Sequence, residues 1–375
     1  MRYSKKICGN KPMKDKTKNA GVDAQTGFAL QRNSALFLLL DKYFSKFNGK
    51  RYFICLEHQD DFLFCFLSGN DDVELIEAFQ SKKKAPDIWK ADTEMYEIIC
   101  KLLKTGKNLI IDSIPKSSHY KHMLYFSTNQ TINLKHKFKK AENKPIVSVS
   151  IKADNISAHF SSLPIEIQGK FKAGILDIGL HSELKNLNLL WIPFTQTVKE
   201  QENQLVGKIE EVFGKKIYSY RSAVQTLITI FNKIEYIYNQ GNEIKLLDET
   251  KRVDNITIEN AIDILTTKSK CFNYWHNAEE SIVDALQIKQ KDRGVFEFVF
   301  SSAFDMFKVF ENAEHRKVLH FAKDNIDNCT KFRRLDIVLE LIELYKKNTS
   351  SLLTPLDLKA IFFAAYFEAT FKNEN

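Results

Sequence analysis

Two groups of polar residues, placed where apolar segments begin or end, have the types and spacing for hydrolysis of a phosphodiester. The first group is the acidic pair Asp60-Asp61, and the second is Gln80-Ser81-Lys82. A carboxylate, an amide oxygen and a backbone carbonyl are hard oxygen ligands that suit Mg²⁺. A bound cation neutralises charge on the non-bridging phosphate oxygens, and a lysine beside the attacking water stabilises the charge that develops. The residue types therefore predict a metal-dependent phosphodiesterase site.

The two groups are expected to meet because they lie on the two strands of one hairpin. The apolar segments 61–67 and 73–80 read as strands, and the turn residues 68–72 join them. Residues two apart on a strand project from the same face about 6.6 Å apart. Gln80 and Lys82 should therefore point in one direction, with the Ser81 carbonyl between them.

The register of this hairpin decides which carboxylate faces Gln80. Simple pairing across the turn places Gln80 opposite Asp60, and a one-residue shift or bulge places it opposite Asp61. The sequence leaves both registers open. Glu57, at the end of the preceding strand, adds a further carboxylate near this point.

The hairpin belongs to a longer run of elements in the first part of the chain. The segment 61–67 is apolar on both faces, so we expect both faces of the sheet to be covered. The order is helix, three strands, helix and strand, followed by a strand-like segment and a helix. These elements are expected at 27–47, 52–56, 61–67, 73–80, 92–104, 120–128, 187–194 and 196–213, and 146–187 is ambiguous.

Beyond residue 216 the pattern changes to successive long helices. They are expected at 219–239, 256–270, 277–287, 294–325, 330–348 and 354–372. The chain is thus expected to have three parts. These are a basic flexible arm at 1–22, an α/β domain at 23–215, and an all-α domain at 216–375 that serves docking or oligomerisation.

The charge of the chain is compatible with an anionic partner. The 375 residues carry a net charge of +8, which favours nucleic acid or an anionic membrane surface, although a lysine-rich proteome explains the same charge. A basic cluster occupies 135–144. We expect phosphate contacts from Lys83 and Lys84 beside the site and from Lys137, Lys139 and Lys140 in the cluster.

Cysteine spacing and hydropathy exclude some classes of protein. The six cysteines include no C-x-x-C pair, so neither a zinc knuckle nor a redox motif is expected. Free thiols are typical of a reducing compartment, and we expect a cytoplasmic location. No apolar run approaches the ~18 residues needed to span a bilayer, so no membrane association through a spanning helix is expected.

Taken in order, the motifs resemble the PD-(D/E)xK, or restriction-endonuclease-like, superfamily in its D…QxK form. Within it, the chain is similar to the double-stranded DNA endonuclease domain of CBASS anti-phage effectors, which also occurs in the nuclease subunit of Lamassu defence systems. The resemblance covers about residues 20–215. Its motifs are Gly27-Phe28-Ala29-Leu30-Gln31, Glu57-His58-Gln59-Asp60-Asp61, Phe79-Gln80-Ser81-Lys82-Lys83-Lys84, Trp89 and Tyr125-Phe126-Ser127-Thr128-Asn129.

The resemblance implies a fold and a set of roles. The fold is an α/β restriction-endonuclease-like domain, with a mixed sheet flanked by helices. The family's Glu-x-x-x-Asp spacing favours Asp61 over Asp60 as the metal ligand. Gln80 and Ser81 would complete the Mg²⁺ site, which Mn²⁺ could also fill, and Lys82 would be catalytic. The supporting residues would be Glu57, Asp60 and Gln31.

One residue departs from the usual pattern of the superfamily. Gln80 stands where a second carboxylate is usual, so the site is less negative and should hold Mg²⁺ more weakly. We expect the site to fill when DNA supplies its own phosphate oxygens. Equal metal affinity with and without DNA would exclude this expectation.

The implied function is that of a bacterial defence effector that cuts double-stranded DNA and is controlled by a partner and by homo-oligomerisation. The second half reads as helices rather than as a cyclic-nucleotide sensor, which favours an SMC-like ATPase complex, as in Lamassu, or a HerA-type ATPase as the partner. Two alternatives stay open. They are a non-catalytic DNA-binding or scaffold protein with a nuclease-like fold, and a ribonuclease on the same fold.

Overall fold

The computed structural model describes residues 20–58, 60–83, 88–138, 145–235, 246, 248–307 and 313–370, without the side chains of 20–26, 57, 58, 60, 235 and 313. Most of the expected basic arm at 1–22 therefore lies outside the described residues. So do Lys84, Lys139 and Lys140. No helix in the described part of the chain is both long and apolar enough to cross a membrane.

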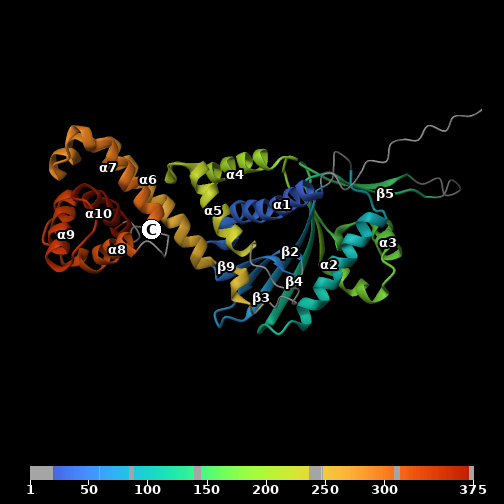
Figure 1. The fold of residues 1–375 in the computed structure, drawn as a ribbon. Coiled ribbons are helices and arrows are strands. Elements are labelled where there is room, and N and C mark those ends of the chain that lie inside the picture. The colour runs from blue at the N-terminus through green and yellow to red at the C-terminus, as the bar shows by residue number, and fades with distance from the viewer. Residues whose placement is uncertain are drawn as a thin grey trace, which may run out of the picture.

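A mixed seven-stranded sheet forms the centre of the first part of the chain (Figure 1). Its strand order is β7-β8-β4-β3-β2-β1-β9, and β5 and β6 form a separate two-stranded ribbon. Strand β3 is antiparallel to β2 and parallel to β4, and β4 is parallel to β8. The strands are β1 (Tyr52–His58), β2 (Asp60–Leu67), β3 (Val73–Lys82), β4 (Lys116–Thr128), β5 (Ile132–His136), β6 (Val147–Ile151), β7 (Ser157–His159), β8 (Leu187–Trp191) and β9 (Arg252–Asp254).

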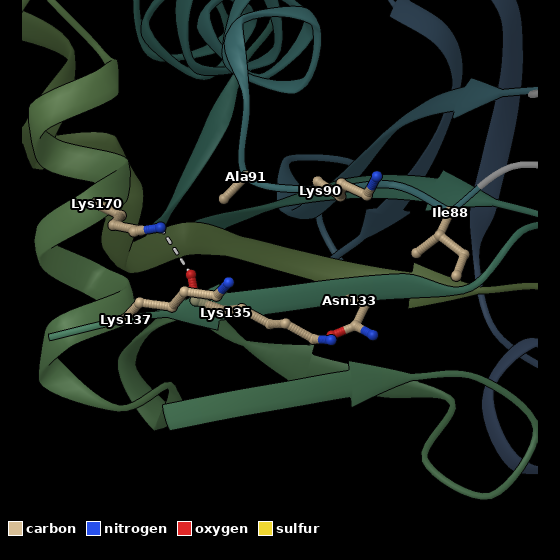
Figure 2. Close-up of a pocket in the computed structure, with 7 residues that line it drawn as sticks. All are labelled: Ile88, Lys90, Ala91, Asn133, Lys135, Lys137 and Lys170. Carbon is tan, nitrogen blue, oxygen red and sulfur yellow. Dashed lines mark hydrogen bonds between the residues drawn. The ribbon is translucent and has the colours of Figure 1, made fainter. Parts of the chain in front are cut away.

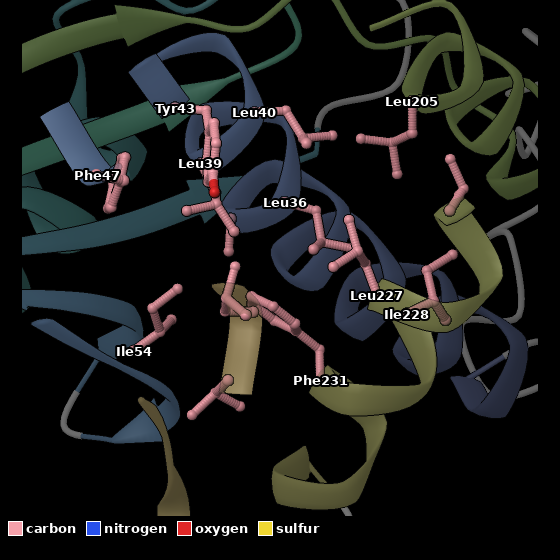
Figure 3. Close-up of a cluster of buried hydrophobic side chains, with 14 of the residues drawn as sticks. Leu36, Leu39, Leu40, Tyr43, Phe47, Ile54, Leu205, Leu227, Ile228 and Phe231 are labelled. Carbon is pink, nitrogen blue, oxygen red and sulfur yellow. The ribbon is translucent and has the colours of Figure 1, made fainter. Parts of the chain in front are cut away.

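Helices cover both faces of this sheet. On one face lie α1 (Ala20–Asp41) with a π-helical turn (Tyr43–Phe47), α4 (Val198–Phe213) and α5 (Tyr220–Glu235). Figure 3 shows side chains of α1, α4 and α5 meeting Ile54 of β1 in this apolar layer. On the other face lie α2 (Thr93–Ile111), α3 (Ile165–Gly174) and two 3-10 segments, Phe160–Ser162 and Ile178–Asn186.

The two faces of β2 enter two different apolar layers. Phe62 and Phe64 pack in the layer of α1, whereas Leu63 and Cys65 pack in the layer of α2. The prediction that this strand is covered on both faces is confirmed. The predicted order of helix, three strands, helix and strand is also confirmed, and the ambiguous region 146–187 contains β6, β7, α3 and the 3-10 segments.

The C-terminal region is helical, as predicted, and has its own apolar core. Its last helix, α10, is buried among the others, and Thr354 accepts a hydrogen bond from the backbone of Asp357 at the start of that helix. The segments expected at 256–270 and 277–287 are one helix with a kink at Ala278. The helices are α6 (Asn255–Leu286), α7 (Arg293–Met306), α8 (Ala313–Asn325), α9 (Arg334–Asn348) and α10 (Pro355–Thr370).

The change from one core to the other falls later than the boundary expected at 216. Helix α5 packs in the layer of α1, and β9 pairs with β1 at the edge of the sheet. The α/β core reaches Leu265 in α6, and the helical core begins at Cys271. The sequence assigned no element to the residues of β9, whose strand conformation accompanies its pairing with β1.

Candidate functional site

The carboxylate of Asp61 is buried where β2 begins and β3 ends, and three groups of β3 surround it. Its Oδ1 accepts a hydrogen bond from Gln80 Nε2 at 2.5 Å, and its Oδ2 accepts one from the Ser81 backbone N–H at 2.6 Å. The Nζ of Lys82 lies 3.5 Å from the same Oδ2. The structure therefore brings together Asp61, Gln80, Ser81 and Lys82, which the sequence singled out.

A bulge in the hairpin sets this arrangement. The pairing of β2 with β3 shifts by one residue between Phe66 and Leu67. Beyond the shift, Phe62 pairs with Phe79, so the next position on each strand aligns Asp61 with Gln80. Of the two registers left open by the sequence, the structure has the one that presents Asp61.

Burial and the groups around Asp61 shift the pKa of its carboxyl group in opposite directions. Removal from water raises the pKa of its carboxyl group, while the charge of Lys82 and the hydrogen bonds from Gln80 and Ser81 lower it, and the net pKa lies above the usual value. The side chain of Asp61 is 9% exposed and that of Lys82 is 33% exposed. The ammonium group therefore bridges the buried carboxylate and the solvent.

The adjoining strand β4 adds polar groups at its C-terminal end, next to the end of β3. Ser127 pairs with Ser81 across the parallel ladder, and their hydroxyl groups lie 2.5 Å apart. Thr128 pairs with Lys82, and its Oγ1 accepts a hydrogen bond from Trp89 Nε1 at 2.9 Å. Sequence reasoning singled out these residues only as motif positions, because their proximity to Lys82 depends on the pairing of β3 with β4.

The structure does not bring every expected residue to Asp61. Gln31 is half-buried on α1, and no hydrogen bond joins it to Asp61 or Gln80 within the described chain. Lys83 and Lys137 are exposed. For Glu57 and Asp60 the structure describes only the backbone.

A second buried carboxylate, Glu77, lies on the opposite face of β3. Its Oε2 accepts a hydrogen bond from Lys46 Nζ at 2.5 Å, and its Oε1 accepts one from the Tyr125 hydroxyl at 3.1 Å. Lys46 also lies over the ring of Phe66, 5.0 Å from its centroid. Burial and the nearby carboxylate raise the pKa of Tyr125, so its hydroxyl stays a neutral donor. Sequence reasoning did not single out this cluster.

A pocket of about 380 Å³ lies between the Trp89 segment, β5 and α3 (Figure 2). Four lysines line it, and no acidic side chain is among its lining residues. The Nζ of Lys170 donates to the backbone carbonyl of Lys135 at 2.7 Å. The lining residues are Ile88, Lys90, Ala91, Asn133, Lys135, Lys137 and Lys170.

Comparisons of the chain with protein-family models, with curated proteins and with solved structures each return no match. What the fold defines is an α/β unit with a mixed seven-stranded sheet, followed by a helical region. The function must therefore be argued from the site itself.

Proposed function

We propose that this chain is a metal-dependent endonuclease of double-stranded DNA whose active site comprises Asp61, Gln80, Ser81 and Lys82. The observation that carries the proposal is the convergence of the last three residues on the buried Asp61 carboxylate. The mixed sheet flanked by helices is compatible with the architecture that the resemblance to the restriction-endonuclease-like family implies.

The donor set fits the requirements of Mg²⁺. Asp61 offers a carboxylate, Gln80 an amide oxygen and Ser81 a backbone carbonyl, and all three are hard oxygen donors. These residues would hold the cation, which when bound would neutralise charge on the non-bridging oxygens of the scissile phosphodiester. In the structure the Gln80 amide presents its nitrogen to Asp61, so it would have to rotate to turn its oxygen toward a cation that Asp61 holds.

The protein groups have separate roles in this proposal. The Ser81 N–H holds the Asp61 carboxylate in one orientation, so the ligand is positioned before the cation arrives. Lys82, a third exposed, reaches from Asp61 toward solvent, where it can stabilise charge at the attacking water and the phosphate. Such preorganised charge is commonly worth about 10²–10³-fold in rate.

One observation favours the alternative of a non-catalytic scaffold with a nuclease-like fold. Both oxygens of Asp61 already have protein partners, as a purely structural carboxylate would. A ribonuclease on the same fold is the second alternative, and comparison of RNA with DNA substrates separates it from the main proposal.

The wider biological role stays a prediction of the resemblance. It comprises anti-phage defence, control by an SMC-like or HerA-type ATPase, and homo-oligomerisation in the active state. The helical region that follows the sheet is the part proposed to dock with such a partner. Co-purification of the full chain with a candidate ATPase would test this prediction.

The test of the catalytic proposal uses supercoiled plasmid incubated with the purified full chain and Mg²⁺, with EDTA as the control. We expect Asp61→Asn and Lys82→Met to lower the cleavage rate by about 10²-fold or more. Lys121→Met, an exposed lysine on β4 away from the site, should cut at the wild-type rate. Wild-type cleavage by the Lys82→Met protein, or equal cleavage in EDTA, would contradict the proposal.

A further inference from the structure

The pocket lined by Lys90, Lys135, Lys137 and Lys170, here called the lysine pocket, concentrates positive charge. Within the described residues, no carboxylate lies within ion-pairing distance of Lys90, Lys135 or Lys137. The one hydrogen bond that a lysine ammonium group of this pocket makes within the described chain, from Lys170, is to a backbone carbonyl and leaves its charge in place. Like charges gathered in a concave surface raise the local potential and favour an anionic ligand.

The strand β5 directs two polar side chains to one side. Ile132 and Leu134 are buried, whereas Asn133 and Lys135 alternate with them and face the pocket. Lys137 continues this row one step beyond the strand, so Asn133, Lys135 and Lys137 follow each other at intervals of about 6.6 Å. Figure 2 shows their polar ends along the pocket together with that of Lys90. An extended ligand with repeated negative charges matches this row better than a single small anion does.

Trp89 links the lysine pocket to the strand position paired with Lys82. The side chain of Trp89 donates to Thr128, which is the ladder partner of Lys82. The backbone of Trp89 accepts a hydrogen bond from Asn133 N–H at 2.8 Å, and Lys90 follows Trp89 directly. The pocket and the Asp61 site therefore lie at the same edge of the structure, with Trp89 between them.

We propose that the lysine pocket binds backbone phosphates of the DNA strand on one side of the bond that is cut. This inference rests on the proposed function, because DNA enters the pocket only if DNA is the substrate. The contacts are to phosphates, so they position the duplex and carry no sequence preference. They assign a role to Lys90, Lys135 and Lys170, which sequence reasoning did not single out as individual contacts.

The test measures binding of a short DNA duplex to the full chain in EDTA, by fluorescence anisotropy over a series of salt concentrations. The variant K135Q/K137Q removes two charges from the pocket, and K104Q/K107Q removes two charges from exposed positions of α2. Each phosphate contact contributes about 0.9 to the slope of log affinity against log salt. We expect the slope of K135Q/K137Q to fall by about 1.8, with affinity about tenfold or more weaker at about 0.1 M salt.

The control variant K104Q/K107Q and competition by inorganic phosphate show whether binding depends on the lysine pocket. K104Q/K107Q should bind like wild type, and thermal midpoints should show that both variants are folded. Equal binding by the two variants, no binding by wild type, or displacement of DNA by millimolar inorganic phosphate at constant ionic strength would each overturn the inference. Binding in EDTA is independent of cleavage, so loss of binding in K135Q/K137Q without any wild-type cleavage would instead count against the proposed function alone.

Discussion

Asp61 on β2 and Glu77 on β3 are buried carboxylates, and each has a lysine partner. The contacts around the two carboxylates differ. Glu77 lies in the interior of the sheet, where Lys46 and Tyr125 each contact one of its oxygens. Asp61 lies where β2 begins, and Lys82 Nζ is 3.5 Å from its Oδ2, a longer contact than the 2.5 Å between Lys46 and Glu77. The two lysine side chains are equally exposed, at 33%, so the pairs differ in distance rather than in burial. The closer Lys46–Glu77 pair is suited to holding the fold, whereas the looser Lys82–Asp61 pair is suited to exchanging partners with a ligand.

The largest expected effect is a difference in the free energy of unfolding between variants of the two carboxylates. Glu77→Gln removes the charge that Lys46 contacts, and we expect it to lower the free energy of unfolding by about 2 kcal/mol. Asp61→Asn removes a buried charge but also one of the two hydrogen-bond acceptors, so we expect a smaller loss of stability than in Glu77→Gln. Denaturant unfolding of both variants measures the difference. A greater loss of stability in Asp61→Asn than in Glu77→Gln would reverse the assignment of structural and functional roles.

The second prediction concerns the neutral side chain at position 80. Gln80→Glu replaces the donor to Asp61 with a second carboxylate, so without metal we expect a loss of about 1–2 kcal/mol of stability. Millimolar Mg²⁺ should restore the thermal midpoint, and chelation should remove the gain. Glu77→Gln serves as the comparison, because a cation at Asp61 has no reason to restore it. The absence of any metal-dependent shift in Gln80→Glu would count against a cation site.

The smallest expected effect is the pH dependence contributed by Asp61. Because its pKa is raised in the folded state, the folded protein binds this proton more tightly than the unfolded chain. The stabilisation is complete below the ordinary aspartate pKa and is lost as pH rises through the raised value. The thermal midpoint of wild type relative to Asp61→Asn should therefore fall as pH rises from acid toward neutrality. A difference that is constant across this range would contradict the raised pKa.

Much of the α/β unit was predictable from residue patterns. The strand 61–67 was expected to be covered on both faces because apolar residues occupy both of its faces, and the structure agrees. The grouping of Gln80 with Lys82 followed from strand geometry alone. Such features depend on residues close in the sequence, where spacing carries the information.

The remaining features depend on contacts between distant segments. The bulge at Phe66 decides the register of β2 with β3, and no local residue pattern predicts it. Glu77 was missed because its partners, Lys46 and Tyr125, come from a helix end and another strand. The lysine pocket was missed as a whole because Lys90 and Lys170 join the basic cluster only after β5 packs beside α3.

The pairing of β9 with β1 has a consequence for any attempt to divide the chain. A protein that ended at 215 would lack β9 and would leave the backbone hydrogen-bonding groups of β1 unpaired on that side. An unpaired strand edge promotes self-association by strand addition. Helix α6 begins at the residue after β9, with Asp254 accepting from Thr257 N–H at 2.7 Å. A force applied to the start of α6 would thus reach β1 directly through β9, with no loop between the helix and the strand.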